Sequence, residues 1–163
     1  MDNIKYHNID PVYDENSKIL ILGSFPSVKS REEEFYYAHP QNRFWRVLSA
    51  VTGSDTPVTV NEKRELLIKN RIALWDCLSS CEIKGSSDAS IRAETPNDIG
   101  LILSKAEITT IFTNGTTAYK YYNKYLREQS RTDAILLPST SPSNASKSLD
   151  ALIREWSIIK NYL

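Results

Sequence analysis

Short apolar runs alternate along the chain with longer segments in which apolar residues recur every three or four positions. Four of the runs predict strands buried on both faces, because they leave neither face polar. These predicted strands cover residues 18–22, 71–76, 108–112 and 133–137. The longer segments have helical periodicity and predict helices, with Asn61 as the cap of the second. These predicted helices cover residues 43–52, 62–69, 97–105, 117–129 and 147–161.

This alternation predicts an α/β fold in which helices cover both faces of a parallel sheet. We therefore expect a three-layer α/β/α sandwich with a central four-stranded parallel sheet. The chain has no internal repeat, low-complexity tract or linker, so residues 1–163 are expected to form one domain, with residues 1–17 as a polar N-terminal arm. Residues 77–91 are expected to form a long Ser-rich loop, and loops of that length inside a compact domain are usually functional.

Composition is that of an ordinary globular protein and excludes several classes. Hydrophobic residues make up 40% of the 163, and 20 basic residues balance 20 acidic ones, so no overall positive field attracts nucleic acid. The N-terminus lacks the apolar core of a signal peptide, and no apolar run is long enough to span a membrane. Cys77, Cys81 and two histidines provide neither an iron–sulfur nor a zinc ligand pattern. We expect a cytoplasmic protein with reduced cysteines, no metal, no cofactor and no membrane partner.

Each predicted strand is followed by a segment rich in polar residues, Gly or Pro. In a parallel sheet the carboxyl ends of the strands meet at one edge, which is where open α/β sheets bind ligands. Four such segments are therefore expected to converge, at residues 23–27, 76–80, 113–115 and 138–144. Shortly after the first of them, residues 36–45 gather aromatic, amide and cationic side chains. The whole stretch from Lys18 to Trp45 is the expected floor of an active site.

Two motifs at these strand ends resemble the uracil-DNA glycosylase superfamily. The first is GSFPS followed by YYAHPQNRFW, and the second is LPSTSPSNA near the C-terminus. The AHPQNRFW segment is most similar to the mismatch-specific branch, and GSFPS together with WDCLSSCEIKGSSDASI resembles the hypoxanthine-DNA glycosylase (DNA-deoxyinosine glycosylase) group. The resemblance covers about residues 18–146. It implies the α/β fold expected above and the release of a damaged base from DNA.

One position departs from the superfamily pattern. Relatives carry an Asn or an Asp in the first motif that positions the attacking water, and this chain has Phe25 there. The resemblance to the hypoxanthine group implies that another Asn takes over this role, and Asn42 is the candidate. Asp76, at the end of the second predicted strand, is the alternative catalytic residue. Asn42 could instead be an amide that only braces its loop.

The resemblance also implies which residues form the base pocket. Tyr37 aligns with the aromatic residue that stacks on the flipped base, and Tyr36 could line the same wall; the alternative is that both tyrosines are core or surface residues. Asn114 follows the third predicted strand, where relatives often read the base edge with an Asn, but Asn is also a favoured turn residue before Gly. The backbone amides of Ser24 and Phe25 are the expected donors to the exocyclic oxygen of the base.

Two Ser-rich segments are candidates for binding the DNA backbone. Small hydroxyl side chains and free amides can approach phosphates closely, and prolines stiffen a loop that enters the minor groove. The alternative for each segment is a plain solvent-exposed turn. The candidates are Ser27, Lys29, Ser139, Ser141, Pro142, Ser143 and Asn144. A local basic rim is expected from Lys29, Arg31, Arg43, Lys84, Arg92 and Lys147.

The leading hypothesis is a monofunctional DNA glycosylase of base excision repair that flips out a deaminated base and hydrolyses its N-glycosidic bond. Hypoxanthine in deoxyinosine is the first candidate, and uracil, mismatched thymine and xanthine are alternatives within the same fold. A noncatalytic damaged-DNA-binding module is a second class. A small α/β hydrolase is disfavoured, because the chain has neither a G-x-S-x-G elbow nor a Walker loop. The expected partner is DNA with a deaminated or mismatched base, bound by a monomer because one flipped base needs one pocket.

Overall fold

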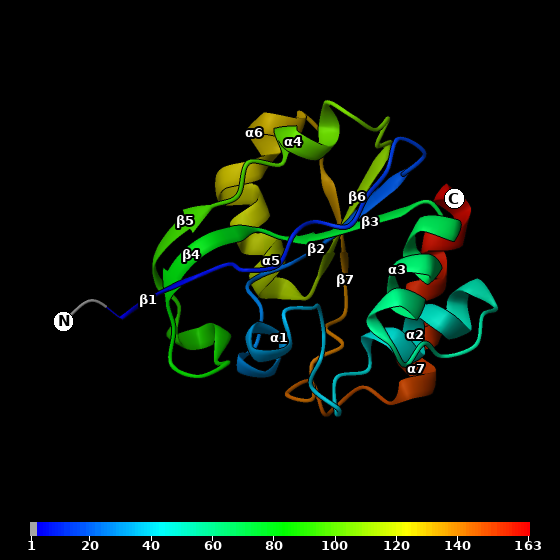
Figure 1. The fold of residues 1–163 in the computed structure, drawn as a ribbon, viewed down its shortest axis with the longest axis horizontal. Helices are drawn as coiled ribbons and strands as arrows, with labels where there is room; N and C mark the ends of the chain where they lie inside the picture. Colours follow the sequence, from blue (N-terminus) through cyan, green and yellow to red (C-terminus); the bar gives the residue numbers. More distant parts are fainter. Residues whose placement is uncertain (1–2) are drawn as a thin grey trace.

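Four parallel strands form the centre of the fold in the computed structural model, which describes residues 3–163 (Figure 1). They are β2 (Ile19–Gly23), β3 (Ile72–Asp76), β6 (Thr110–Asn114) and β7 (Ala134–Leu137), in the order β3-β2-β6-β7. Every residue of β2 and β3 is buried, which explains their continuous apolar sequences. The expected four-stranded parallel sheet is confirmed.

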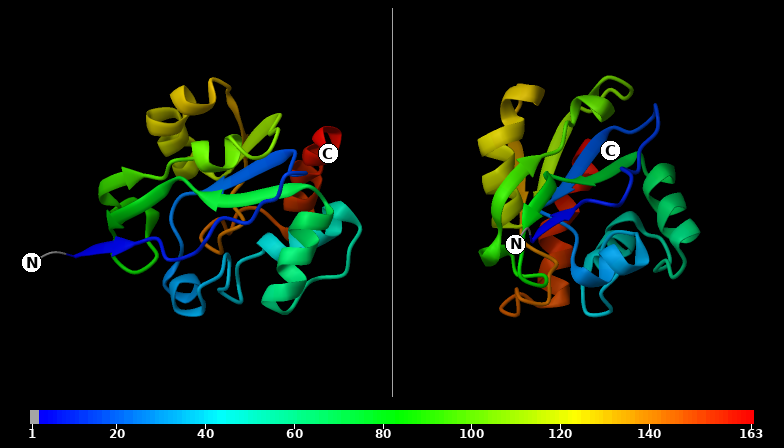
Figure 2. Two further views of the ribbon diagram at one scale, coloured as in Figure 1. Left: turned by 45° about the horizontal axis from the view of Figure 1, so that its top comes forward. Right: turned by 60° about the vertical axis from the view of Figure 1, so that its left-hand side comes forward.

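Helices cover both faces of this sheet, so the expected three-layer arrangement is also confirmed (Figures 1 and 2). One face carries α2 (Phe44–Thr52), α3 (Val60–Lys69), α7 (Leu149–Trp156) and the 3₁₀ helix η3 (Ser157–Tyr162). The other carries α4 (Gly100–Leu103), α5 (Thr116–Tyr121), the π-helix η2 (Tyr122–Leu126) and α6 (Arg127–Ser130). None of the helices within residues 3–163 is long and apolar enough to cross a lipid bilayer.

Two helices begin at other residues than expected, because side-chain hydrogen bonds fix the conformation of the chain at each start. Thr59 and Glu62 form a capping box, so α3 starts early and Asn61 is not its cap. Asn97 does not start a helix either. Its side chain is buried, and its amide nitrogen donates to two backbone carbonyls at the junction that follows β3, at 2.9 and 3.1 Å. The chain after Asn97 is therefore tied to the sheet, and α4 is left as a single short turn.

A second, unexpected sheet lies beside the first. It contains β1 (Ile4–Tyr6), β4 (Leu78–Glu82) and β5 (Arg92–Pro96), antiparallel in the order β1-β4-β5. The expectation of one loop over residues 77–91 was therefore wrong. The register between β4 and β5 shifts twice, which removes the regular alternation by which a strand is recognised in sequence. The N-terminal arm supplies the edge strand β1, and its residues 1 and 2 lie outside the described part of the chain.

Trp156 of α7 connects the last helix to the end of the sheet. It is completely buried and lies edge-on to Phe44 of α2, with ring centroids 5.8 Å apart. Its indole nitrogen donates to the carbonyl of Pro138 at 2.9 Å. Because Pro138 follows β7 directly, this bond sets the direction in which the chain leaves the sheet.

We expect Trp156→Ala to lower the free energy of unfolding by about 3–5 kcal/mol, because it removes a buried aromatic ring and leaves a cavity. Urea unfolding followed by circular dichroism measures this change. Val58→Ala is the control, because Val58 is 79% exposed. Its effect should stay within about 0.5 kcal/mol. Equal effects of the two substitutions would contradict the packing described for Trp156.

Candidate functional site

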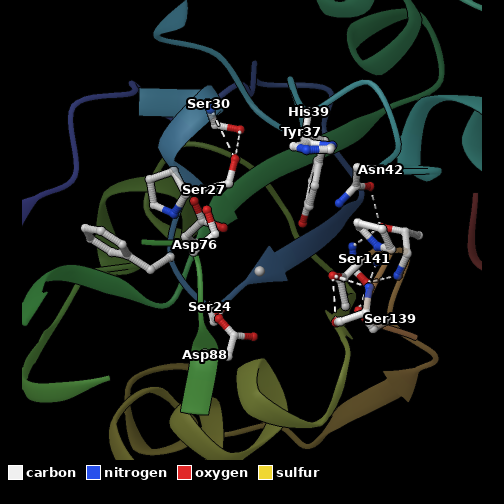
Figure 3. A pocket seen from close by; sticks show the side chains of 18 of the residues that line it. Ser24, Ser27, Ser30, Tyr37, His39, Asn42, Asp76, Asp88, Ser139 and Ser141 are labelled. Atoms are coloured by element: carbon white, nitrogen blue, oxygen red, sulfur yellow. Dashed lines mark hydrogen bonds between the residues drawn. The ribbon is translucent and has the colours of Figure 1, made fainter. Parts of the chain in front are cut away.

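A cavity of about 600 Å³ lies at the edge where the four parallel strands end (Figure 3). Ligand pockets in proteins usually measure roughly 300–1,000 Å³. All four expected strand ends contribute to the wall, so their convergence is confirmed. The expected site residues that line the cavity are Ser24, Phe25, Ser27, Tyr36, Tyr37, Asn42, Asp76, Asn114, Ser139, Ser141, Pro142 and Ser143. Lys29 and Asn144 are not part of the lining.

The floor of the cavity depends on the missing side chain of Gly23, the last residue of β2. A Cβ atom at this position would lie 2.4 Å from Asp76 Oδ1 and 2.8 Å from the Tyr37 hydroxyl. No real Cβ fits at such distances, so the glycine leaves room for both the carboxylate and the phenol above the end of the strand. Asp76 reaches this point because β3 pairs with β2 in the register that sets Gly23 opposite Asp76.

Tyr37 presents an aromatic ring and a hydroxyl to the cavity. Its ring stacks on Phe44, with centroids 4.1 Å apart and an interplanar angle of 18°. Its backbone has a φ of 52°, which is uncommon for a bulky residue and recurs at functional sites. The hydroxyl is buried and has no partner at ordinary hydrogen-bond geometry among the described residues, although the side chain of Asn114 lies close enough to oppose the rise of its pKa. Burial, and next the charge of Asp76, raise the pKa of Tyr37 well above its ordinary value, so the hydroxyl stays protonated and can donate.

Two other aromatic residues of the predicted base pocket are part of the core. Tyr36 is 2% exposed, and its hydroxyl donates to the carbonyl of Asp10 at 2.9 Å. Phe25 is 7% exposed, and the Arg31 guanidinium lies 5.6 Å from its ring centroid. Both residues border the cavity from behind. The Phe25 side chain therefore packs where relatives are expected to carry a water-positioning carboxamide.

Asn42 is held in one orientation by its own oxygen. Asn42 Oδ1 accepts from the backbone N–H of Phe44 and from Thr140 Oγ1, each at 2.9 Å. A backbone N–H can only donate, so the amide oxygen must face the start of α2. Both lone pairs of this oxygen are then engaged. The amide nitrogen has no partner among residues 3–163 and is available to the cavity as a donor (Figure 3).

Thr140 links the two candidate amides and was not among the expected site residues. Asn114 Nδ2 donates to Thr140 Oγ1, and the backbone N–H of Thr140 donates to Asn114 Oδ1, both at 3.0 Å. Thr140 Oγ1 in turn donates to Asn42. Asn114 is therefore a brace for the loop after β7 as well as a lining residue. Each of its amide atoms keeps one further hydrogen-bonding position for a ligand.

Arg43 holds the Ser-rich loop and does not belong to an exposed basic rim, which corrects that expectation. Its guanidinium donates to the carbonyls of Ser141, Asn144 and Lys147, and its backbone N–H donates to the carbonyl of Thr140. Charge-assisted bonds of this kind are stronger than neutral ones. The loop is thereby fixed in a shape that leaves Pro142 and Ser143 exposed at the mouth of the cavity.

The second Ser-rich segment caps a helix that was not expected. Ser27 Oγ accepts from the backbone N–H of Ser30 at 3.1 Å and begins α1 (Val28–Glu33). Lys29 on this helix forms an ion pair with Glu33 at 3.2 Å. Both ions are partly exposed, and such pairs are weak and easily exchanged for a phosphate. Ser27 thus has a structural role at the cavity wall, and Lys29 lies outside it.

Asp76 has a partner that no sequence pattern indicated. Asp76 is 3% exposed, and its Oδ2 atom lies 2.8 Å from Nε2 of His7, which follows β1 in the N-terminal arm. The other carboxylate oxygen, Oδ1, forms no hydrogen bond within the described chain and faces the floor above Gly23. Asp76 is therefore held at one oxygen and free at the other.

Asp88 is a second carboxylate at the cavity, in the loop between β4 and β5. Ser24 Oγ donates to Asp88 Oδ1 at 2.9 Å. Desolvation, opposed by the hydrogen bond from Ser24 and reinforced by the charge of Asp76, raises the pKa of Asp88. The residue as a whole is exposed, but its carboxyl is turned toward Ser24 (Figure 3). Across residues 3–163, no group of three or more His, Cys, Asp or Glu side chains could hold a metal ion.

Comparisons with known proteins agree with this arrangement. The profile of the Uracil DNA glycosylase superfamily matches residues 11–160. A protein of Methanosarcina barkeri (strain Fusaro) described as hypoxanthine DNA glycosylase is 33% identical over 145 residues, which are 88% of this chain and 91% of the relative. A protein of Methanosarcina acetivorans with the same description is 38% identical over 135 residues, 82% of this chain and 84% of the relative.

A solved structure is similar as well. It is the solution NMR structure of a protein from Methanosarcina acetivorans described as a candidate uracil DNA glycosylase. The TM-score is 0.81 at 33% sequence identity, and the similarity covers 96% of this chain and 96% of the other. The residue range matched by the family profile, 11–160, includes every segment that lines the cavity.

We expect Gly23→Ala to destabilise the protein by about 1–3 kcal/mol, because the added methyl overpacks the cavity floor. Urea unfolding of Gly23→Ala, alone and combined with Asp76→Ala, tests whether contact with Asp76 causes this loss. In an Asp76→Ala background the cost should be smaller, because the nearest obstructing atom is gone. Gly53→Ala is the control: Gly53 has a φ of +69° and open space around it, so its cost should be equal in both backgrounds. An unchanged cost for Gly23→Ala would contradict the described contact.

We expect the contribution of Asp88 to stability to fall as the pH rises from the ordinary Asp value of 3.8 through the raised pKa of Asp88. The folded protein binds this proton more tightly than the unfolded chain, so ionisation of Asp88 works against folding. Asp88→Asn keeps an acceptor for Ser24 and does not titrate. The difference in unfolding free energy between Asp88→Asn and the unaltered protein should therefore increase with pH over this range.

Ser24→Ala provides the matched comparison for Asp88. It removes a hydrogen bond that favours the ionised carboxylate, so the unfolding free energy of Ser24→Ala relative to the unaltered protein should decrease as the pH rises over this range. Urea unfolding at a series of pH values measures both variants. Parallel pH curves for all three proteins would contradict a raised pKa at Asp88.

Proposed function

The chain belongs to the Uracil DNA glycosylase superfamily, and from this premise we propose that it is a monofunctional DNA glycosylase that releases a deaminated base from DNA, with hypoxanthine in deoxyinosine as its substrate. The observation that supports this most is the set of unengaged polar atoms that share one cavity at the end of the sheet. They are the Tyr37 hydroxyl, the Asn42 amide nitrogen and Asp76 Oδ1. Two of them are donors, and the third is an acceptor.

These atoms suit a flipped hypoxanthine. The base carries a carbonyl oxygen that accepts hydrogen bonds and a ring N–H that donates one. The Asn42 nitrogen and the Tyr37 hydroxyl can donate to the base, and Asn114 Oδ1 can accept from it. One face of the Tyr37 ring is covered by Phe44. The base therefore stacks on the opposite face in this proposal. The backbone amides of Ser24 and Phe25 are further donors at the cavity wall.

The reaction is the hydrolysis of the N-glycosidic bond. The enzyme first extrudes the nucleotide, at a cost of a few kcal/mol that is smaller for a poorly paired deaminated base. In the transition state the sugar gains positive charge and the leaving base gains negative charge. Asn42 and Asp76 are the residues that hold the attacking water, and the donors in the cavity stabilise the departing base. Positioning and preorganised donors of this kind can supply several kcal/mol.

The loop after β7 is the surface that contacts the DNA backbone. Ser139, Ser141 and Ser143 combine small hydroxyls with a stiff backbone, and Pro142 is exposed between the last two of them. The hydrogen bonds from Arg43 hold this loop in one shape before DNA binds, which lowers the entropy cost of binding. One flipped base occupies one cavity, so we propose that a monomer acts on DNA that contains a deaminated or mismatched base.

We expect the protein to release the base from a duplex oligonucleotide with a single deoxyinosine. The measurement is strand scission by alkali at the abasic site, under single-turnover conditions. Asn42→Ala and Asp76→Asn should each slow release of the base by about 10²–10⁴-fold, because each removes a group that holds the attacking water. Lys160→Ala, on the exposed surface of η3, should leave the rate unchanged.

Parallel substrates separate the alternatives. Oligonucleotides with uracil, xanthine or a G·T mismatch are compared with deoxyinosine at the same enzyme concentration. Faster release of uracil than of hypoxanthine would assign the protein to a neighbouring substrate class. Tight binding without release of any base, by a protein that is folded, would refute the enzyme and leave a damaged-DNA-binding module.

A further inference from the structure

The N-terminal arm contributes a residue to the buried side of the site. We propose that His7 is a positioning residue, which holds Asp76 so that its free oxygen accepts a proton from the attacking water. This inference rests on the proposed glycosylase activity and names the group that activates the water. His7 belongs to the arm before β2, which lies outside both sequence motifs.

His7 is itself held firmly. It directly follows β1, and its backbone N–H donates to the carbonyl of Ser79 at 2.8 Å, which extends the pairing of β1 with β4. The imidazole lies among three aromatic rings, with centroids 6.1 Å from Phe25, 6.1 Å from Tyr36 and 6.3 Å from Trp75. Only 4% of the His7 side chain and 5% of the Asp76 side chain are exposed. The pair is therefore closed off from solvent on the side away from the cavity.

The hydrogen bonds of His7 define which nitrogen carries the proton. The backbone N–H of Ile9 donates to Nδ1 of His7 at 3.3 Å, so Nδ1 is an acceptor. Nε2 then carries the proton and donates to Asp76 Oδ2 at 2.8 Å. A buried carboxylate needs such a partner, because an unpaired one is strongly disfavoured. His7 thus engages Oδ2 and leaves Oδ1 toward the cavity floor.

The two candidate residues differ in what they can do for water. Asn42 offers the cavity only its amide nitrogen, because both lone pairs of its oxygen are taken by Phe44 and Thr140. A donor can bind the oxygen of a water but cannot remove its proton, and an amide does not titrate. Asp76 Oδ1 is an acceptor with no other hydrogen bond among the described residues. Asp76 is therefore the general base that accepts the proton of the water, and Asn42 is a hydrogen-bond donor.

The step is balanced without a cofactor. The water oxygen forms a bond to C1′ of the sugar as the bond from C1′ to the base nitrogen breaks. The electron pair of that bond leaves with the base. One water proton passes to Asp76 Oδ1, and from there it returns to the released base or to solvent. His7 keeps its proton throughout and stabilises the carboxylate through Oδ2.

The test compares two substitutions that are similar in size and differ in one property. Gln at position 7 can place an N–H near the position of Nε2, and Met fills the same space without a donor. We expect His7→Met to slow single-turnover release of hypoxanthine by about ten- to a hundredfold, with little change in the Kd for the oligonucleotide. His7→Gln should recover most of the rate. Tyr6→Ala is the control in the same arm, because this side chain is 67% exposed.

A double substitution distinguishes positioning from a general loss of structure. If His7 acts through Asp76, adding His7→Met to Asp76→Asn should slow the reaction no further than Asp76→Asn alone. Multiplied effects, or a folded His7→Met with the full rate, would overturn the inference while the proposed function stands. No release of any base by the unaltered protein would refute the proposed function, and this inference with it.

A measurement on the unaltered protein does not depend on whether the variants fold. In ¹⁵N–¹H spectra, the Nε2 proton of His7 should exchange slowly with solvent. Binding of an oligonucleotide with an abasic-site analogue should shift its resonance, because the ligand occupies the other side of Asp76. A His7 ring protonated on Nδ1 alone would overturn the assignment.

Discussion

The adjacent residues Asn42 and Arg43 join the two segments that close the cavity, and the shape of the site depends on them. Asn42 Oδ1 binds both the first turn of α2 and Thr140, and Arg43 binds three carbonyls of the loop after β7. Carbonyls in an irregular loop need partners, and a guanidinium supplies several donors in one plane. Two segments that are distant in sequence thus form one wall, and the same contacts that stabilise the loop orient the Asn42 amide toward the cavity.

A second constraint sets the floor. β2 and β3 lie side by side with Gly23 opposite Asp76, and only a residue without a side chain leaves room there for a carboxylate and a phenol. Tyr37 reaches the same point from the segment after α1, with an uncommon positive φ. Its hydroxyl is buried without a partner in the described chain, and buried polar groups rarely remain so without a function. The floor thus keeps a polar group for a bound molecule, and the burial of this group without a partner lowers the stability of the fold.

The polar atoms of the site are divided by function. Donors come from Tyr37 and Asn42, which are positioned by stacking on Phe44 and by the Thr140 network. The free acceptor comes from Asp76, which is held from behind by the N-terminal arm. This division matches a reaction that must stabilise negative charge on a leaving base and remove a proton from water. The Phe25 side chain of the first motif is packed in the core, so it takes no direct part in the reaction.

Much of the fold and the location of the site could be predicted from the sequence. The four central strands are buried on both faces and therefore appear as unbroken apolar runs, and their order along the chain with helices between them implies a parallel sheet whose ends converge. The motifs identified Tyr37, Asn42 and Asn114 as residues that line one cavity. The sheet β1-β4-β5 did not appear, because its strands are half exposed and irregular in register, so their side chains follow no simple period.

Only the tertiary structure decided how the candidate groups are oriented. His7 and Asp76 are 69 positions apart, and Asn42 and Thr140 are 98 apart, so no local pattern relates them. The sequence determined that an amide and a carboxylate are present at the ends of strands and loops. The packing of the arm and the last loop decided that the amide offers a donor and the carboxylate an acceptor, because hydrogen bonds from distant segments occupy their other atoms.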